Sequence, residues 1–284
     1  MTLPAVLFAS GGGSNVRALL NAHREASGGR SGDSDSASLS APPSAPPSAP
    51  PFAPPFAPPP APPFAPPSSP PFAPPSAPPF APPSSPPSWF PALLVTDRDD
   101  APVLEHAGAY GLPHVVVPPG PDFESRLVRV LTDVDAGRGA GMLVLAGYLR
   151  LVPPGVVRRW AGRILNVHPS LLPAFGGKGM YGARIHAAVL AAGVQVTGVT
   201  VHLVDERFDE GPILAQWPVP VRPDDTPATL AARVLATEHR LYPAAVEHVA
   251  AWLAARDASV FGDAHAAPPS LSASQLLRTG LVFP

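Results

Sequence analysis

Two segments of the chain carry side chains that could together catalyse a reaction at a carbonyl carbon. Residues 166–173 read Asn-Val-His-Pro-Ser-Leu-Leu-Pro, and residues 204–212 read Val-Asp-Glu-Arg-Phe-Asp-Glu-Gly-Pro. An amide and an imidazole can stabilise a developing oxyanion, and a nearby carboxylate favours and orients the imidazolium. These residue types therefore predict an enzyme site formed by Asn166, His168 and Asp205.

A third candidate segment lies near the start of the chain, where residues 9–15 read Ala-Ser-Gly-Gly-Gly-Ser-Asn. An apolar run precedes it and apolar residues at helical spacing follow it, which predicts a strand, a tight turn and a helix. That order directs backbone N–H groups and a helix N-terminus at one spot, where an anion binds well. The spacing matches neither the dinucleotide fingerprint nor a Walker loop, so a small phosphate monoester is the favoured ligand and a plain turn the alternative.

The elements that must position these segments alternate between strand and helix. Strands are predicted over residues 3–8, 92–96, 114–117, 142–146, 164–166, 197–204 and 213–221. Helices are predicted over residues 101–110, 122–132, 153–160 and 226–253, with Pro243 expected to break or kink the last one. This alternation is typical of an α/β fold with a doubly wound, mostly parallel sheet, whose ligands bind at the carboxyl ends of the strands.

Composition excludes several classes of function. The chain has 284 residues, a formal net charge of −2 and no cysteine. The charge gives no electrostatic footprint for nucleic acid or an anionic membrane, and the missing thiols exclude disulfides, thiolate catalysis and zinc–sulfur sites. The N-terminus lacks the pattern of a signal peptide, and no apolar run is long enough to span a membrane. We therefore expect a cytoplasmic protein.

A low-complexity tract interrupts the α/β pattern over residues 27–88, where Ala-Pro-Pro-Ser and Ala-Pro-Pro-Phe repeats dominate. Paired prolines remove hydrogen-bond donors and fix φ, so we expect a disordered insertion without helix or sheet. The tract falls in a helix-to-strand connection, which places it at the edge of the sheet opposite the predicted site. The predicted organisation is one domain over residues 1–256 that contains the insertion 27–88, followed by a C-terminal tail over 257–284.

Taken together, the segments resemble the phosphoribosylglycinamide formyltransferases of purine biosynthesis. The shared motifs are the glycine loop, the His-Pro-Ser segment, and two stretches that read Ala-Gly-Tyr-Leu-Arg-Leu-Val at 146–152 and Thr-Glu-His-Arg-Leu-Tyr-Pro at 237–243. The resemblance implies a Rossmann-like formyltransferase fold in a monomer or homodimer. It also implies transfer of a formyl group from 10-formyltetrahydrofolate to the amine of glycinamide ribonucleotide, without a metal.

The resemblance also assigns roles to individual residues. It implies that Asn166, His168 and Asp205 are catalytic. The phosphoribosyl group would be held by Gly13, Ser14, Asn15 and Glu238, and the folate by Arg126, Leu149, Arg150, Leu151, Val152 and Asn166. Glu238 as a surface glutamate and Arg126 on a solvated helix face are the alternatives. The glycine-rich loop 174–182 is expected to be a mobile lid, and Lys178 within it could reach phosphate or a folate carboxylate.

Other functions compete with this interpretation. Methionyl-tRNA formyltransferases share the catalytic trio but carry an extra C-terminal domain, and formyltetrahydrofolate deformylases carry an N-terminal regulatory domain. The chain begins directly on a strand and ends in an unpatterned tail, so both classes are disfavoured. The proline-rich tract could instead serve as a partner-binding scaffold. A metal site formed by His168, His202 and Asp205 is a weaker alternative.

Overall fold

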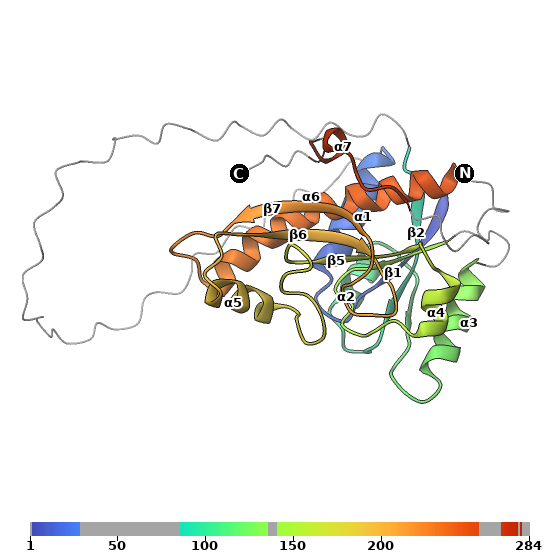
Figure 1. The fold of residues 1–284 in the computed structure, drawn as a ribbon. Helices are drawn as coiled ribbons and strands as arrows, with labels where there is room; N and C mark the ends of the chain where they lie inside the picture. Colours follow the sequence, from blue (N-terminus) through green and yellow to red (C-terminus); the bar gives the residue numbers. More distant parts are fainter. Residues whose placement is uncertain (1, 29–85, 136–140, 256–267, 278, 280–284) are drawn as a thin grey trace, which may run out of the picture. The chain divides into compact units, whose positions relative to one another are not determined.

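The computed structural model describes residues 2–28, 86–135, 141–255, 268–277 and 279. The predicted insertion over 27–88 lies almost entirely outside the described part of the chain. The described part of the predicted formyltransferase domain forms a sheet with helices against both faces (Figure 1). None of the described helices is long and apolar enough to cross a membrane.

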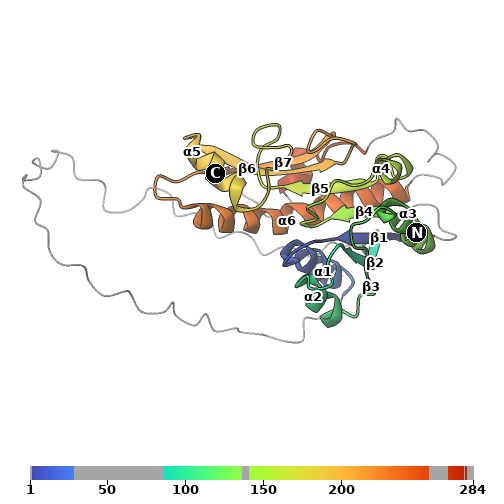
Figure 2. The same cartoon turned by 90° about the horizontal axis from the view of Figure 1, so that it is seen from below.

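The sheet has seven strands in the order β3-β2-β1-β4-β5-β6-β7 (Figure 2). Neighbouring strands from β3 to β5 pair in parallel, whereas β6 is antiparallel to both β5 and β7. The order reverses between β1 and β4, which is where doubly wound sheets bind ligands. The predicted α/β fold with a mostly parallel sheet is therefore confirmed. The strands are β1 (Leu3–Phe8), β2 (Trp89–Thr96), β3 (His114–Val116), β4 (Met142–Leu145), β5 (Ile164–His168), β6 (Val196–Leu203) and β7 (Ile213–Pro220).

The helices divide between two apolar clusters, one on each face of the sheet. The larger cluster receives side chains from α1 (Ser14–Ala26), α2 (Val103–Ala109), α5 (Ala183–Ala191) and α6 (Pro227–Ala254). The smaller cluster receives side chains from α3 (Phe123–Asp135) and α4 (Pro154–Arg159). Figure 2 shows α3 and α4 together, across the sheet from α1 and α2. Burying both faces of the central strands explains why their sequences are continuous apolar runs.

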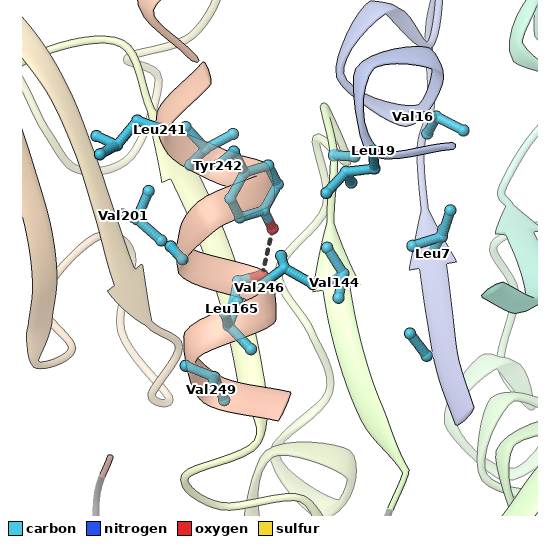
Figure 3. Close-up of a cluster of buried hydrophobic side chains, with 14 of the residues drawn as sticks. Leu7, Val16, Leu19, Val144, Leu165, Val201, Leu241, Tyr242, Val246 and Val249 are labelled. Carbon is cyan, nitrogen blue, oxygen red and sulfur yellow. Dashed lines mark hydrogen bonds between the residues drawn. The ribbon is translucent and has the colours of Figure 1, made fainter. Parts of the chain in front are cut away.

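Helix α6 is the main support of the larger cluster (Figure 3). It begins after Thr226, whose side chain caps the first turn reciprocally with Thr229. The buried Tyr242 hydroxyl lies 3.0 Å from the carbonyl oxygen of Leu145 and 3.1 Å from that of Leu165, which ties the helix to β4 and β5. The helix runs for 28 residues as one element with Pro243 inside it, so of the two expected effects of Pro243, a break or a kink, the break does not occur.

Two described elements were not predicted from the sequence. Helix α5 follows the glycine-rich loop 174–182, and glycine-rich sequence gives no helix signal before it. At the other end of the chain, a short helix α7 (Ala273–Leu277) belongs to the segment predicted as a tail. Before this helix, Leu271 is 8% exposed and its N–H donates to the carbonyl oxygen of Leu214 at 2.8 Å. This described part of the tail therefore packs against β7.

The described residues that flank the insertion lie at the amino ends of the strands. Helix α1 leads into the insertion, and Ser88 precedes β2 on its far side. The Ser88 carbonyl oxygen accepts a hydrogen bond from the N–H of Leu3 at 2.9 Å, and its own N–H donates to the Glu247 carboxylate at 3.0 Å. Leu3 is the first residue of β1, so Ser88 sits at the edge opposite the carboxyl ends of the parallel strands.

Candidate active site

The last strand of the parallel series, β5, carries two of the predicted catalytic residues on one face. Asn166 and His168 alternate with Leu165 and Val167, which belong to the larger apolar cluster under α6. Asn166 and His168 consequently point to the opposite face of the sheet. In the antiparallel register with β6, Asn166 pairs with His202. The sheet thus places an amide and two imidazoles together at the carboxyl end of β5.

Hydrogen bonding gives the two nitrogens of His168 different roles. The ring is 4% exposed, and its Nε2 lies 3.0 Å from the carbonyl oxygen of Phe175. A carbonyl oxygen can only accept a hydrogen bond, so Nε2 carries a proton and donates it. The other nitrogen, Nδ1, lies 3.5 Å from Oδ2 of Asp209. Because Nε2 is committed to the backbone, Nδ1 is the nitrogen left for exchange of a proton with a substrate.

Asp209 is the carboxylate that the structure brings to His168. Its side chain is 13% exposed, and Oδ2 accepts a hydrogen bond from the backbone N–H of Gly177 at 2.9 Å. Its Oδ1 lies 3.7 Å from Nε2 of His202. The chain returns to the sheet through Gly211, where an added Cβ would lie 1.9 Å from the carbonyl oxygen of Leu203. Only glycine permits this close turn, which folds Asp209 back over β5 and β6.

Asp205, which the sequence analysis placed in the catalytic trio, lies elsewhere. Its Oδ1 accepts a hydrogen bond from the backbone N–H of Arg207 at 2.8 Å, its Oδ2 lies 3.7 Å from Nη2 of the same residue, and its side chain is 34% exposed. No ion pair joins it to His168 within the described residues. The reason is the antiparallel direction of β6, whose end meets the amino end of β5: the N–H of Val204 bonds the carbonyl oxygen of Ile164 at 2.9 Å. In the described structure, the carboxylate beside His168 is therefore that of Asp209 and not that of Asp205.

The glycine loop forms a second part of the site, next to the reversal in strand order. Gly13 has a φ of 69°, and an added Cβ would lie 2.4 Å from Cγ2 of Val103, so both the backbone conformation and the available space require glycine. The loop leads into the N-terminus of α1, where Ser14 is the first helical residue. This arrangement directs the backbone N–H groups of the first turn of α1 toward one spot, a geometry that suits an anion such as a phosphate.

Two buried polar residues lie beside this loop. Nδ2 of Asn15 donates to Oε2 of Glu238 at 2.6 Å, while Oδ1 of Asn15 is buried and has no partner among the described residues. Glu238 is only 7% exposed on the buried face of α6. Burial raises the pKa of the Glu238 carboxyl to about 7, an effect that the Asn15 hydrogen bond partly offsets. A buried carboxyl and an unpartnered amide oxygen are suited to a polar ligand, and Glu238 is not a surface glutamate.

This raised pKa makes stability depend on pH in a specific direction. Between pH 4.5, which is the ordinary pKa of a glutamate, and about pH 7, the folded state retains a proton on Glu238 that the unfolded chain has lost. Stability should consequently fall as pH rises through this window, by up to about 3 kcal/mol for a shift of this size. Relative to the wild type, the variant Glu238→Gln should therefore become more stable as the pH rises from 5 to 8.

Denaturant unfolding at both pH values measures this gain, and Glu105→Gln on the exposed side of α2 is the control. The difference in unfolding free energy between Glu238→Gln and the wild type should grow with pH, whereas that of the control should stay constant. A difference for Glu238→Gln that is equal at the two pH values would contradict a buried carboxyl of this kind.

The predicted folate-binding segment follows β4, beside the glycine loop. The backbone N–H of Leu149 donates to Oγ of Ser10 at 3.2 Å, which connects the two segments. Leu149 and Leu151 are 59% and 39% exposed, which leaves them available to a flat apolar ligand. Nε of Arg150 donates to Oδ2 of Asp97 at 2.6 Å.

Two of the predicted folate residues have other surroundings. The side chain of Val152 is buried in the smaller apolar cluster, so only its backbone is available to a ligand. Arg126 is half-buried on α3, a helix that packs on the smaller apolar cluster. Within the described ranges, no group of three or more His, Asp or Glu side chains could hold a metal ion.

Comparison with known proteins agrees with this geometry. The sequence model of the formyl transferase family matches residues 90–246. The chloroplastic phosphoribosylglycinamide formyltransferase of Arabidopsis thaliana is 47% identical over 152 residues, which are 53% of this chain and 52% of that protein. The enzyme of the same name from Bacillus subtilis is 36% identical over 160 residues, 56% of this chain and 79% of its own length. The chain spans about half the length of the plant relatives that it matches.

A solved structure is similar to this chain over more of its length than these relatives are. The phosphoribosylglycinamide formyltransferase of Brucella melitensis superposes with a TM-score of 0.59 and 32% identity, covering 88% of this chain and 97% of its own. The family match includes the segment with Asn166, His168 and Asp209 as well as Glu238 on α6. The chain therefore belongs to the formyl transferase family.

Proposed function

We propose that the protein is a phosphoribosylglycinamide formyltransferase of de novo purine biosynthesis. It transfers the formyl group of 10-formyltetrahydrofolate to the amine of glycinamide ribonucleotide, which yields formylglycinamide ribonucleotide and tetrahydrofolate. The observation that carries the proposal is the convergence of Asn166, His168 and Asp209 at the carboxyl end of β5. The names of the most similar curated proteins and solved structures support it.

The proposed reaction uses Nδ1 of His168 as the site of proton exchange. Attack of the amine on the formyl carbon forms a C–N bond, and the electron pair of the carbonyl moves to its oxygen. Asn166 donates a hydrogen bond to this oxyanion, an interaction of about 3–4 kcal/mol in a preorganised site. Nδ1 accepts the proton that the amine nitrogen releases. Asp209, whose Oδ2 lies 3.5 Å away, stabilises the resulting imidazolium.

Collapse of the intermediate completes the transfer. The oxyanion re-forms the carbonyl, the bond between the formyl carbon and N10 of the folate breaks, and N10 receives the electron pair together with the proton from Nδ1. The hydrogen bond from Nε2 of His168 to the Phe175 carbonyl keeps the ring in one orientation throughout. Proton transfer of this kind contributes about 10²–10⁴-fold to a rate.

The remaining site residues would hold the two substrates. Gly13 and Ser14 at the start of α1 would bind the phosphate through backbone N–H groups. The Asn15 amide oxygen and the Glu238 carboxyl would bind the ribose or the amine nearby. Leu149, Leu151 and the backbone at Arg150 and Val152 would form the folate wall, with Arg126 as a more remote folate contact.

The insertion is proposed to be an inert spacer, and a deletion tests this. Residues 30–85 would be replaced by a short Gly-Ser linker, which keeps Ser88 and its bonds to Leu3 and Glu247. Because these flanking residues lie at the edge opposite the site, kcat and KM should change by less than about twofold. A folded deletion variant without activity would show instead that the tract has a role in turnover.

We further propose a cytoplasmic location, a monomer or homodimer as the functional state, and turnover without metal, nucleic acid or membrane. Turnover unaffected by a chelator would support the proposal of a metal-independent reaction.

The choice between transferase and deformylase depends on the fate of the formyl group. Release of tetrahydrofolate from 10-formyltetrahydrofolate should require glycinamide ribonucleotide and should be negligible with water or methionyl-tRNA as the only acceptor. Tetrahydrofolate released at the same rate without glycinamide ribonucleotide would favour the deformylase, and release that depends on methionyl-tRNA would favour the tRNA formyltransferase.

A further inference from the structure

A second buried histidine, His202 on β6, lies directly across the strand pair from Asn166. It is 2% exposed, and its Nε2 lies 3.1 Å from Nδ2 of Asn166. The proposed reaction gives His202 no proton to transfer. Because this buried imidazole contacts the amide that would bind the oxyanion, its hydrogen bonding bears on the orientation of that amide.

The hydrogen bonds of His202 fix its tautomer. Its Nδ1 lies 2.8 Å from the carbonyl oxygen of Leu203, which can only accept, so Nδ1 carries the proton. Burial lowers the pKa of His202, an effect opposed by the Leu203 carbonyl and by the negative charges of Asp209 and Asp205, and reinforced by His168. A neutral ring with its proton on Nδ1 has a bare lone pair on Nε2. Nε2 is therefore an acceptor.

This acceptor decides which way the Asn166 amide faces. A carboxamide can rotate by half a turn and exchange its NH₂ group with its oxygen at little steric cost. With NH₂ toward Nε2 of His202, one N–H is bonded and the second remains free to donate. In the rotated state the amide oxygen would meet the lone pair of Nε2, and the group facing the substrate would be an acceptor that repels an oxyanion.

We propose that His202 is a positioning residue that holds the Asn166 amide in its donating orientation through the lone pair on Nε2. The proposal rests on the proposed function, because it gives Asn166 the task of binding the oxyanion. His202 touches neither substrate in this account and acts only through Asn166. Its contribution should therefore appear in kcat and disappear when the amide is absent.

The first test compares two variants of His202. His202→Leu removes the acceptor, and we expect kcat to fall by about 10²-fold, the usual cost of a misplaced catalytic group, with KM for both substrates nearly unchanged. His202→Gln can place an amide oxygen near the position of Nε2 and should recover much of this loss. A larger KM with unchanged kcat, or equal losses in the two variants, would overturn the proposal.

The second test is a double-mutant cycle with Asn166. In the background of Asn166→Ala, His202→Leu should have almost no further effect on kcat, because the amide that it orients is gone. Effects that multiply would show that His202 acts independently of Asn166 and would overturn the proposal.

A spectroscopic test uses the wild-type protein and does not depend on turnover. Long-range ¹H–¹⁵N correlation spectra of the histidine rings report which nitrogen carries the proton. The proposal requires His202 in the Nδ1–H form, and an Nε2–H form would overturn it even if the protein proves to be an active transferase. Conversely, a wild type without formyl transfer but with the Nδ1–H form would reject the proposed function and leave the orientation of Asn166 supported.

Discussion

Replacing Asp209 by Asn is expected to lower kcat for formyl transfer by about 10²–10⁴-fold, the range for losing a participant in proton transfer. The carboxylate lies 3.5 Å from Nδ1 of His168, which is the ring nitrogen that does not bond the Phe175 carbonyl. An amide of the same shape keeps the hydrogen bond from Gly177 available but removes the negative charge that stabilises the imidazolium. Steady-state kinetics with both substrates measures this effect.

Asp205→Asn is the matched control for this variant. It makes the same chemical change four positions away in the same segment, at a side chain that is 34% exposed and bonded only locally. We expect less than about twofold change in kcat, as for ordinary surface substitutions. A large loss in Asp205→Asn together with a small one in Asp209→Asn would restore Asp205 to the catalytic trio and contradict the geometry described above.

Replacing His168 by Ala should have the next largest effect, about 10²–10⁴-fold on kcat. The substitution removes the group that, in the proposed reaction, moves a proton between the amine and N10. It also removes the buried hydrogen bond to the Phe175 carbonyl, so some loss of stability is expected and circular dichroism must confirm that the variant folds.

His114→Ala provides the control for the histidine variant. His114 is exposed at the start of β3, at the far edge of the sheet from β5. Its removal should leave kcat within about twofold of the wild type. A folded His168→Ala variant with near-normal kcat would mean that the amine loses its proton to another group, and the mechanism would have to be withdrawn.

Much of the fold could be predicted because its central strands are buried on both faces and read as uninterrupted apolar runs. The runs that became β1 and β4 are of this kind, and their predicted bounds differ from the structure by at most one residue. The direction of β6 could not be predicted. The alternating pattern of residues 197–204 indicates two unlike faces but does not give the direction of the strand, which only the pairing of Asn166 with His202 reveals.

That unpredicted direction explains why the carboxylate beside His168 is Asp209 and not the predicted Asp205. A parallel strand ending at Leu203 would have delivered Asp205 to the carboxyl edge of the sheet, where ligands bind. The antiparallel strand delivers it to the other edge, and the chain has to turn back to reach His168. A signal for the turn was present in the sequence as the Asp-Glu-Gly-Pro at residues 209–212, since glycine is required where the turn passes the Leu203 carbonyl.

The roles of three further groups could not be found from sequence, because these groups act through the backbone or through cross-strand pairing. The carbonyl of Phe175 and the N–H of Gly177 come from a loop whose side chains suggested only a lid. His202 alternates with apolar residues on β6, where a satisfied core histidine is the ordinary interpretation. Only its cross-strand partner gives it a role.

The most direct test of the central claim follows the formyl carbon itself. The full-length wild-type protein is incubated with 10-formyltetrahydrofolate labelled with ¹³C in the formyl group and with unlabelled glycinamide ribonucleotide, and the products are examined by NMR. We expect the label to appear as the formamide of formylglycinamide ribonucleotide, in an amount equal to the tetrahydrofolate released. Label recovered as free formate, or label that stays on the folate, would contradict it.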